Sequence, residues 1–146
     1  MSGELEKSIR DKMSPVYSEA TIEHVLHPQN MGAMSKADGY GKITGPCGDT
    51  MEVWLRVTNG VVTEATFLTD GCAATIASGN MVAELAKGKS IPQAVKISQQ
   101  DVLDGLGGLP ADNRHCALLA ANTLKEALKD YFVFKREPWK RAYRNN

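Results

Sequence analysis

The three cysteines, Cys47, Cys72 and Cys116, are the residues of this sequence best suited to chemistry. An odd number of thiols is not typical of a secreted disulfide scaffold, in which cysteines occur in pairs. We therefore expect free or metal-bound thiols in a reducing, cytoplasmic compartment. No two of them form a Cys-x-x-Cys pair, so their spacing alone leaves two interpretations open, scattered buried cysteines and a shared metal site.

Each cysteine lies where a secondary-structure element is expected to begin or end. Cys47 lies in a Gly-Pro-Cys-Gly-Asp turn, Cys72 follows Gly71 and opens a helix, and Cys116 stands near the start of the last helix. Helix N-termini carry free N–H groups and a partial positive charge, which favour thiolate over thiol. We therefore predict lowered pKa values for Cys72 and Cys116, giving thiolates that bind a metal or attack a persulfide sulfur.

Three thiolates leave one tetrahedral position open, and Asp49 and His115 are the candidates to fill it. Asp49 faces the same side as Cys47 if that segment is extended. A carboxylate is a harder and weaker ligand than a thiolate for a soft metal, so an oxygen ligand should make the bound metal easier to release. His115 is the better ligand, but neighbours on a helix diverge by about 100°. This leads to the hypothesis that His115 and Cys116 alternate as ligands.

Hydrophobic patterning predicts the elements that position these residues. Alternation over 51–58 and 61–69, joined by Asn59-Gly60, predicts a β-hairpin, and 39–45 is a weaker candidate strand. Helical periodicity and capping signals predict helices over 18–27, over 72–87, after Ser90, over 99–106 and from about 112 to 134. A helix, a sheet and then further helices indicate an α+β fold, a small antiparallel sheet with helices packed on one face.

The length of 146 residues predicts one domain, over residues 15–134. Residues 1–14 are charged and lack the apolar stretch of a secretory signal, so we expect a flexible lead-in. Residues 135–146 are rich in Lys and Arg, which predicts a basic tail that is solvated or docked on an acidic partner. Zero formal net charge argues against a nucleic-acid surface, and no apolar run is long enough to span a membrane.

Ordered motifs along the chain resemble the IscU/NifU-type iron–sulfur cluster assembly scaffolds, the NifU N-terminal domain family. The matching stretches are His27 to Gly32, Gly45-Pro46-Cys47-Gly48-Asp49, Thr69 to Ser78, and Leu109-Pro110 through Arg114-His115-Cys116. The similarity runs from about Tyr17 to Tyr131. It implies a three-stranded antiparallel sheet with helices on one side, and makes 15–134 an iron–sulfur scaffold domain.

The resemblance implies a scaffold, not an enzyme in the strict sense. Such a protein assembles a transient [2Fe–2S] cluster from iron and from sulfur of a cysteine desulfurase, and transfers it to apo iron–sulfur proteins. An iron donor or regulator and a ferredoxin reductant are further implied partners, and Zn²⁺ binds at the same place in family members. The implied cluster-binding residues are Cys47, Asp49, Cys72, His115 and Cys116, with Cys116 as the persulfide acceptor.

The chain also departs from the family pattern. The stretch 109–113 reads Leu-Pro-Ala-Asp-Asn instead of Leu-Pro-Pro-Val-Lys, which argues against recognition by the specialised Hsp70 chaperone. Arg114 is the cation nearest the third cysteine, where the family has a lysine. The alternative function is a zinc-dependent sulfur acceptor that relays persulfide without building a cluster. That branch carries an insertion between Cys72 and Cys116, which this sequence lacks.

Overall fold

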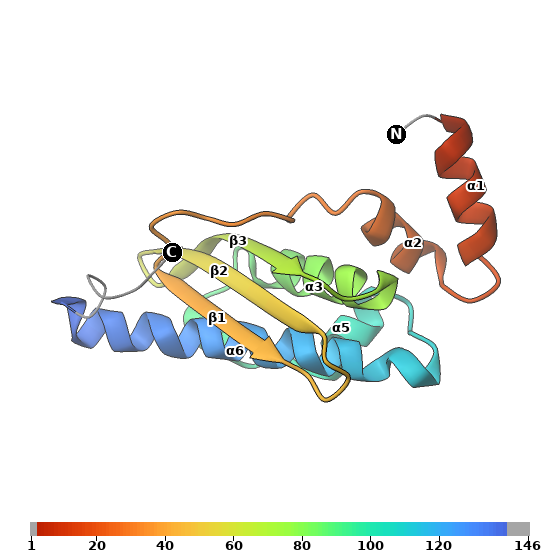
Figure 1. Ribbon diagram of the computed structural model, residues 1–146. Coiled ribbons are helices and arrows are strands. Elements are labelled where there is room, and N and C mark those ends of the chain that lie inside the picture. Colours follow the sequence, from red (N-terminus) through yellow and green to blue (C-terminus); the bar gives the residue numbers. More distant parts are fainter. Residues whose placement is uncertain (1–2, 140–146) are drawn as a thin grey trace.

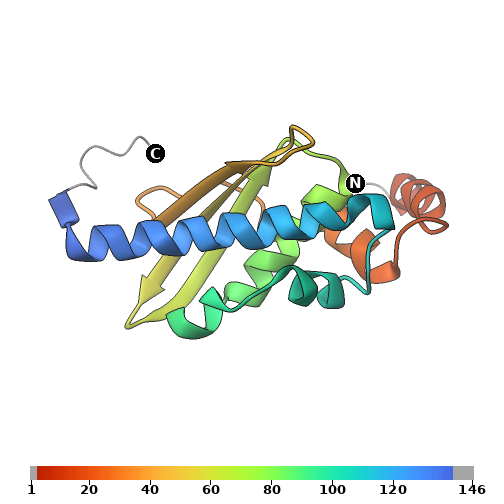
Figure 2. The same ribbon diagram turned by 90° about the horizontal axis from the view of Figure 1, so that it is seen from below.

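A computed structural model describes residues 3–139 of the chain. Three strands form one antiparallel sheet in the order β1-β2-β3, and the helices that follow them in the chain pack on one of its faces (Figures 1 and 2). This is the predicted α+β fold. The elements in chain order are α1 (Gly3–Met13), α2 (Glu19–Leu26), β1 (Gly39–Thr44), β2 (Thr50–Thr58), β3 (Val61–Thr69), α3 (Ala73–Ala86), α4 (Ile91–Val95), α5 (Gln99–Gly105), the 3₁₀ helix η1 (Ala111–Asn113) and α6 (Arg114–Arg136).

The predicted β-hairpin between β2 and β3 is confirmed. Asn59 and Gly60 occupy its turn with φ values of 53° and 76°, which is the positive-φ pair that a type I′ turn requires. The pairing shifts between Arg56 and Val57, where Thr63 is an extra residue that places a bulge in β3. The bulge keeps the buried residues of β3 on the one face that the helices cover.

The weaker candidate strand, β1, pairs with β2 along its whole length. Tertiary packing requires the glycines of β1. A Cβ on Gly39 would lie 2.4 Å from the carbonyl oxygen of Ala127, and one on Gly41 would lie 2.6 Å from that of Thr123. Helix α6 therefore packs directly on the strand backbone, which a side chain at either position would prevent.

The main core lies between the sheet and helices α3 and α6. Phe67 of β3 is fully buried, and its ring lies against Gly79 of α3, where a Cβ would come within 2.4 Å of it. On the opposite face of the sheet, Trp54 is covered by Met34 and Ala37 from the segment before β1. This smaller cluster explains why the second face of β2 is not wholly polar.

The turn between β1 and β2, the start of α3 and the start of α6 all lie at the same end of the fold, and the β2–β3 hairpin lies at the opposite end (Figure 1). The two helix starts and this turn carry the three cysteines. The topology therefore places the candidate site at one end of the sheet, remote from the hairpin.

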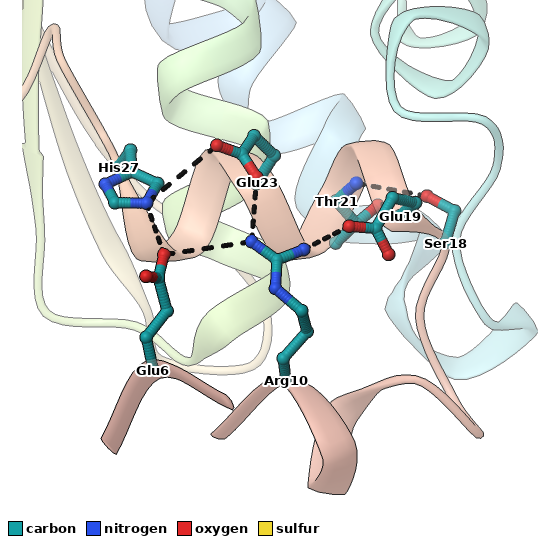
Figure 3. A network of polar contacts seen from close by, with 7 residues as sticks. All are labelled: Glu6, Arg10, Ser18, Glu19, Thr21, Glu23 and His27. Atoms are coloured by element: carbon teal, nitrogen blue, oxygen red, sulfur yellow. Dashed lines mark hydrogen bonds and ion pairs between the residues drawn. The ribbon is translucent and has the colours of Figure 1, made fainter. Parts of the chain in front are cut away.

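Residues 3–13 form helix α1, where the sequence predicts a flexible lead-in. None of its side chains is buried, and charged contacts hold it against α2 (Figure 3). Arg10 pairs with Glu19 and Glu23, and Glu6 contacts the His27 ring. The prediction missed the helix because these partners are distant in sequence. The separation of residues 1–14 from the domain stays a prediction.

Helix α6 ends at Arg136, two residues into the predicted basic tail, and Trp139 is exposed beyond it. Lys135 and Arg136 stand in its last turn, where positive charge is favourable. The remainder of the predicted tail, 140–146, lies outside the described residues. Within residues 3–139, no helix combines the length and the apolar character needed to cross a membrane.

Candidate metal and sulfur site

Three of the five predicted site residues meet at one point. A carboxylate oxygen of Asp49 and the Sγ atoms of Cys72 and Cys116 all lie within 4.8 Å of one another. Asp49 immediately precedes β2, Cys72 is the N-cap of α3, and Cys116 lies in the first turn of α6. Thiolate sulfur and carboxylate oxygen are both ligands that zinc accepts, and thiolates hold iron–sulfur clusters. The fold therefore gathers three metal donors.

The two clustered thiols differ in environment. Cys72 is exposed, and its partial burial raises its pKa. Hydrogen bonds from the backbone and hydroxyl of Thr75 and from the backbone of Ala74 together lower that pKa by more. The pKa of Cys72 therefore lies below its ordinary value, as predicted. Cys116 is 1% exposed, and burial raises the pKa of its thiol, with further increases from the charges of Cys72, Cys47 and Asp49. The predicted lowering at Cys116 is wrong, because burial outweighs the hydrogen bond from Thr75, which by itself lowers the pKa of this thiol.

Thr75 joins the three donors, and the sequence analysis missed it. Its side chain is fully buried, and its hydroxyl donates a 2.9 Å hydrogen bond to Oδ2 of Asp49. The same oxygen lies 3.4 Å from the Sγ of Cys116 and 3.7 Å from the Sγ of Cys72. A signal was present in the sequence, since a hydroxyl three residues after a helix-opening cysteine lies on the same helix face.

The chain entering α3 is packed tightly against this group. A Cβ on Gly71 would lie 2.7 Å from Cβ and Oγ1 of Thr75 and 2.8 Å from Oδ2 of Asp49. Asp70 accepts a 2.8 Å hydrogen bond from the backbone N–H of Thr50, which ties this segment to the start of β2. Only glycine therefore fits at position 71, where the backbone lies against Thr75 and Asp49. Asp70 is the turn residue that holds this backbone segment in place.

The other two predicted residues lie outside this group of three. Cys47 is exposed on the turn, outside the three donors. Gly48, with a φ of 92°, closes that turn by donating its N–H to the carbonyl oxygen of Gly45 at 3.0 Å. His115 is exposed, and its Nε2 lies 3.7 Å from the Sγ of Cys116. The His115 ring therefore reaches its neighbour's sulfur although their side chains leave the helix in different directions.

Tyr17 is a further residue that sequence reasoning missed. It lies between α1 and α2, far from the cysteines in the chain, and is half-buried. Burial raises the pKa of its phenol, and the charges of Cys72 and Cys116 raise it further. The segment before α2 therefore lies near enough to the thiols for their charges to act on the Tyr17 phenol.

Residues 16–137 match the NifU-like N-terminal domain family. The chain belongs to that family. This NifU-like chain is 42% identical over 118 residues to the iron–sulfur cluster assembly scaffold protein IscU 1 of Archaeoglobus fulgidus, covering 80% of the chain and 77% of the relative. It is 38% identical over 132 residues to the iron–sulfur cluster assembly enzyme IscU of Drosophila melanogaster, covering 87% and 85%.

The fold of the NifU-like chain also matches a solved structure. The crystal structure of the N-terminal part of a NifU-like protein from Brucella abortus superposes with a TM-score of 0.64 at 19% identity, covering 83% of the chain and 97% of that structure. The predicted family and fold are therefore confirmed. All four motif stretches of the resemblance lie inside the matched residues 16–137. The roles assigned to individual site residues stay predictions.

Proposed function

We propose that this NifU-like chain is a scaffold on which a [2Fe–2S] cluster is assembled from iron and sulfur, and from which the cluster passes to apo-proteins. The meeting of Asp49, Cys72 and Cys116 within 4.8 Å is the observation that carries this proposal. It supplies metal donors in a chain whose relatives are named for iron–sulfur cluster assembly. In this proposal the cluster is cargo.

The proposed ligands of the cargo are the thiolates of Cys47, Cys72 and Cys116, with Asp49 or His115 in the fourth position. Cys47 would join from its exposed turn, and His115 already lies beside the Cys116 sulfur. An oxygen donor among thiolates binds soft iron–sulfur cargo weakly, which favours release to an acceptor. The same donor set suits Zn²⁺, which we propose as an alternative occupant of the site.

Cys116 is the proposed acceptor of sulfur. Its thiolate would attack the outer sulfur of a persulfide on a cysteine desulfurase, forming a Cys116 persulfide and releasing the desulfurase thiolate. Converting that sulfur into sulfide takes two electrons, which a ferredoxin-type reductant would supply. The thiol is 1% exposed, so the step requires the elements over it to open. The chain accepts this sulfur stoichiometrically and does not turn over as an enzyme does. We place these steps in a reducing, cytoplasmic compartment.

An assembly and transfer assay tests the proposal. The protein is mixed without oxygen with a cysteine desulfurase, cysteine, Fe²⁺ and a ferredoxin reductant, and an apo-ferredoxin is then added. We expect cluster absorption to build up on the chain and to decline as the acceptor gains its cluster. Cys72→Ser and Cys116→Ser should abolish the first step.

Ser90→Ala is the matched control for these variants. It removes another helix N-cap, that of α4, at the hairpin end of the fold, and should leave assembly intact. Persulfide on the chain without any cluster, or a cluster that forms equally well in both cysteine variants, would contradict the proposal.

A further inference from the structure

Three fully buried side-chain hydroxyls on α3 and α6 fall into two groups. Ser78 and Thr123 each donate a 2.7 Å hydrogen bond to the carbonyl oxygen one turn earlier in their own helix. This is the usual way in which a helical Ser or Thr satisfies its hydroxyl. Thr75 instead directs its hydroxyl out of α3, toward Asp49 and two sulfurs. The Thr75 hydroxyl therefore contacts the site residues and not the backbone of its own helix.

A hydroxyl has one proton to donate, and the distances indicate which group receives it. The 2.9 Å separation from Oδ2 of Asp49 is a normal O–H···O hydrogen bond, which is stronger when the acceptor is charged. The two sulfurs, at 3.4 and 3.7 Å, surround the same oxygen. The donor that links the carboxylate to both thiols is thus fully buried and excluded from water.

The position of this hydroxyl is fixed from two sides. Thr75 is β-branched, which restricts a threonine in a helix to two χ1 rotamers. Gly71 packs against it and against Oδ2 of Asp49, leaving no room for a methyl group. Asp49 itself is half-buried and lies on a turn, so the hydrogen bond from Thr75 is the contact that restrains its carboxylate over the thiols.

We propose that Thr75 is a positioning residue of the site, whose hydroxyl holds the Asp49 carboxylate in the orientation in which it binds metal. This inference rests on the proposed function, in which Asp49 is a ligand. Hydrogen-bond partners of metal ligands fix ligand orientation, and their loss costs about 10–100-fold in metal affinity. We expect a loss of that size when the Thr75 hydroxyl is removed.

Zn²⁺ affinity, measured by competition with a chromophoric chelator, tests this without any cluster chemistry. Thr75→Val keeps the shape of the side chain and should bind Zn²⁺ about 10–100-fold more weakly. Thr75→Ser keeps the hydroxyl and should remain within a few-fold of the wild type. Thr123→Val removes an equally buried hydroxyl that bonds only within α6, and should bind Zn²⁺ as the wild type does.

A double-mutant cycle separates positioning from a general structural effect. In an Asp49→Ala background, Thr75→Val should cause no further loss, because the group that Thr75 orients is gone. Circular dichroism checks folding, and Thr75→Ala takes the place of Thr75→Val if the latter does not fold. Wild-type affinity in Thr75→Val, an equal loss in Thr75→Ser, or an undiminished loss in the Asp49→Ala background would each overturn the inference.

The proposed function and this inference fail in different experiments. A chain that binds Zn²⁺ but never forms a cluster refutes the scaffold while leaving the Zn²⁺ comparison intact. Cluster assembly with Zn²⁺ affinity insensitive to the Thr75 hydroxyl refutes the inference and leaves the scaffold standing.

Discussion

Gly71→Ala should damage the site selectively, and its effect can be worked out from the structure. The new Cβ would lie 2.7 Å from Cβ of Thr75 and 2.8 Å from Oδ2 of Asp49. Carbon atoms in good contact are about 3.5–4.0 Å apart, so the overlap with Thr75 is about 1 Å. Gly71 does not have the positive φ that restricts other residues, so the cost is steric and not a matter of backbone strain.

Overpacking of this kind destabilises a protein by about 1–3 kcal/mol. Thr75 is fully buried and restricted to two χ1 rotamers, so the half-buried Asp49 carboxylate is the group that moves. Its displacement breaks the hydrogen bond from Thr75. We therefore expect Gly71→Ala to lower Zn²⁺ affinity by about 10–100-fold in addition to its cost in stability.

Gly60→Ala is the matched control. Gly60 has a φ of 76°, and none of the described residues outside its own turn has an atom within 4 Å of a Cβ built there. A non-glycine residue in this left-handed conformation costs about 1–2 kcal/mol, at the end of the fold remote from the site.

Urea unfolding followed by far-UV circular dichroism gives the free energy of unfolding, and chelator competition gives Zn²⁺ affinity. Both glycine variants should lose stability, but only Gly71→Ala should lose Zn²⁺ affinity. Equal Zn²⁺ affinities in the two variants would refute the reasoning, as would a Gly71→Ala protein as stable as the wild type.

Three further predictions concern the thiols, the core and cluster release. At neutral pH iodoacetamide should alkylate Cys72 before Cys116. The lowered pKa of the exposed Cys72 gives more thiolate, and the raised pKa of the buried Cys116 gives less. Equal alkylation rates, measured by mass spectrometry, would contradict this. Gly79→Ala places a Cβ 2.4 Å from the Phe67 ring and should lower the free energy of unfolding by about 1–3 kcal/mol, so an unchanged urea midpoint would count against the packing described. Asp49→Ala should slow cluster transfer to an apo-ferredoxin, and unchanged rates would argue against a role in release.

The elements that the sequence predicted best are those fixed by interactions between residues near one another in the chain. Asn59 and Gly60, flanked by alternating strands, fix the hairpin within a few residues of chain. Helix α4 is similarly local, since Ser90 caps it and Gln93 completes the capping box. Strand β1 was less certain, because its glycines serve the approach of α6, a contact between distant parts of the chain.

The remaining features depend on tertiary contacts. Helix α1 forms where its charges find partners on α2, which its own residues do not reveal. The motifs located Asp49, Cys72 and Cys116, but the burial that raises the pKa of Cys116 comes from the packed fold. Thr75 was missed because its role depends on Asp49, which reaches it from the other side of the site.

The proposed function requires the chain to hold an iron–sulfur cluster at this site. The decisive measurement is anaerobic reconstitution with iron and sulfide, followed by iron and acid-labile sulfide analysis and a visible spectrum. We predict iron and sulfide in equal amounts and thiolate-to-iron absorption, both lost in Cys72→Ser and Cys116→Ser. A colourless protein that holds only zinc and no labile sulfide would contradict the proposed function.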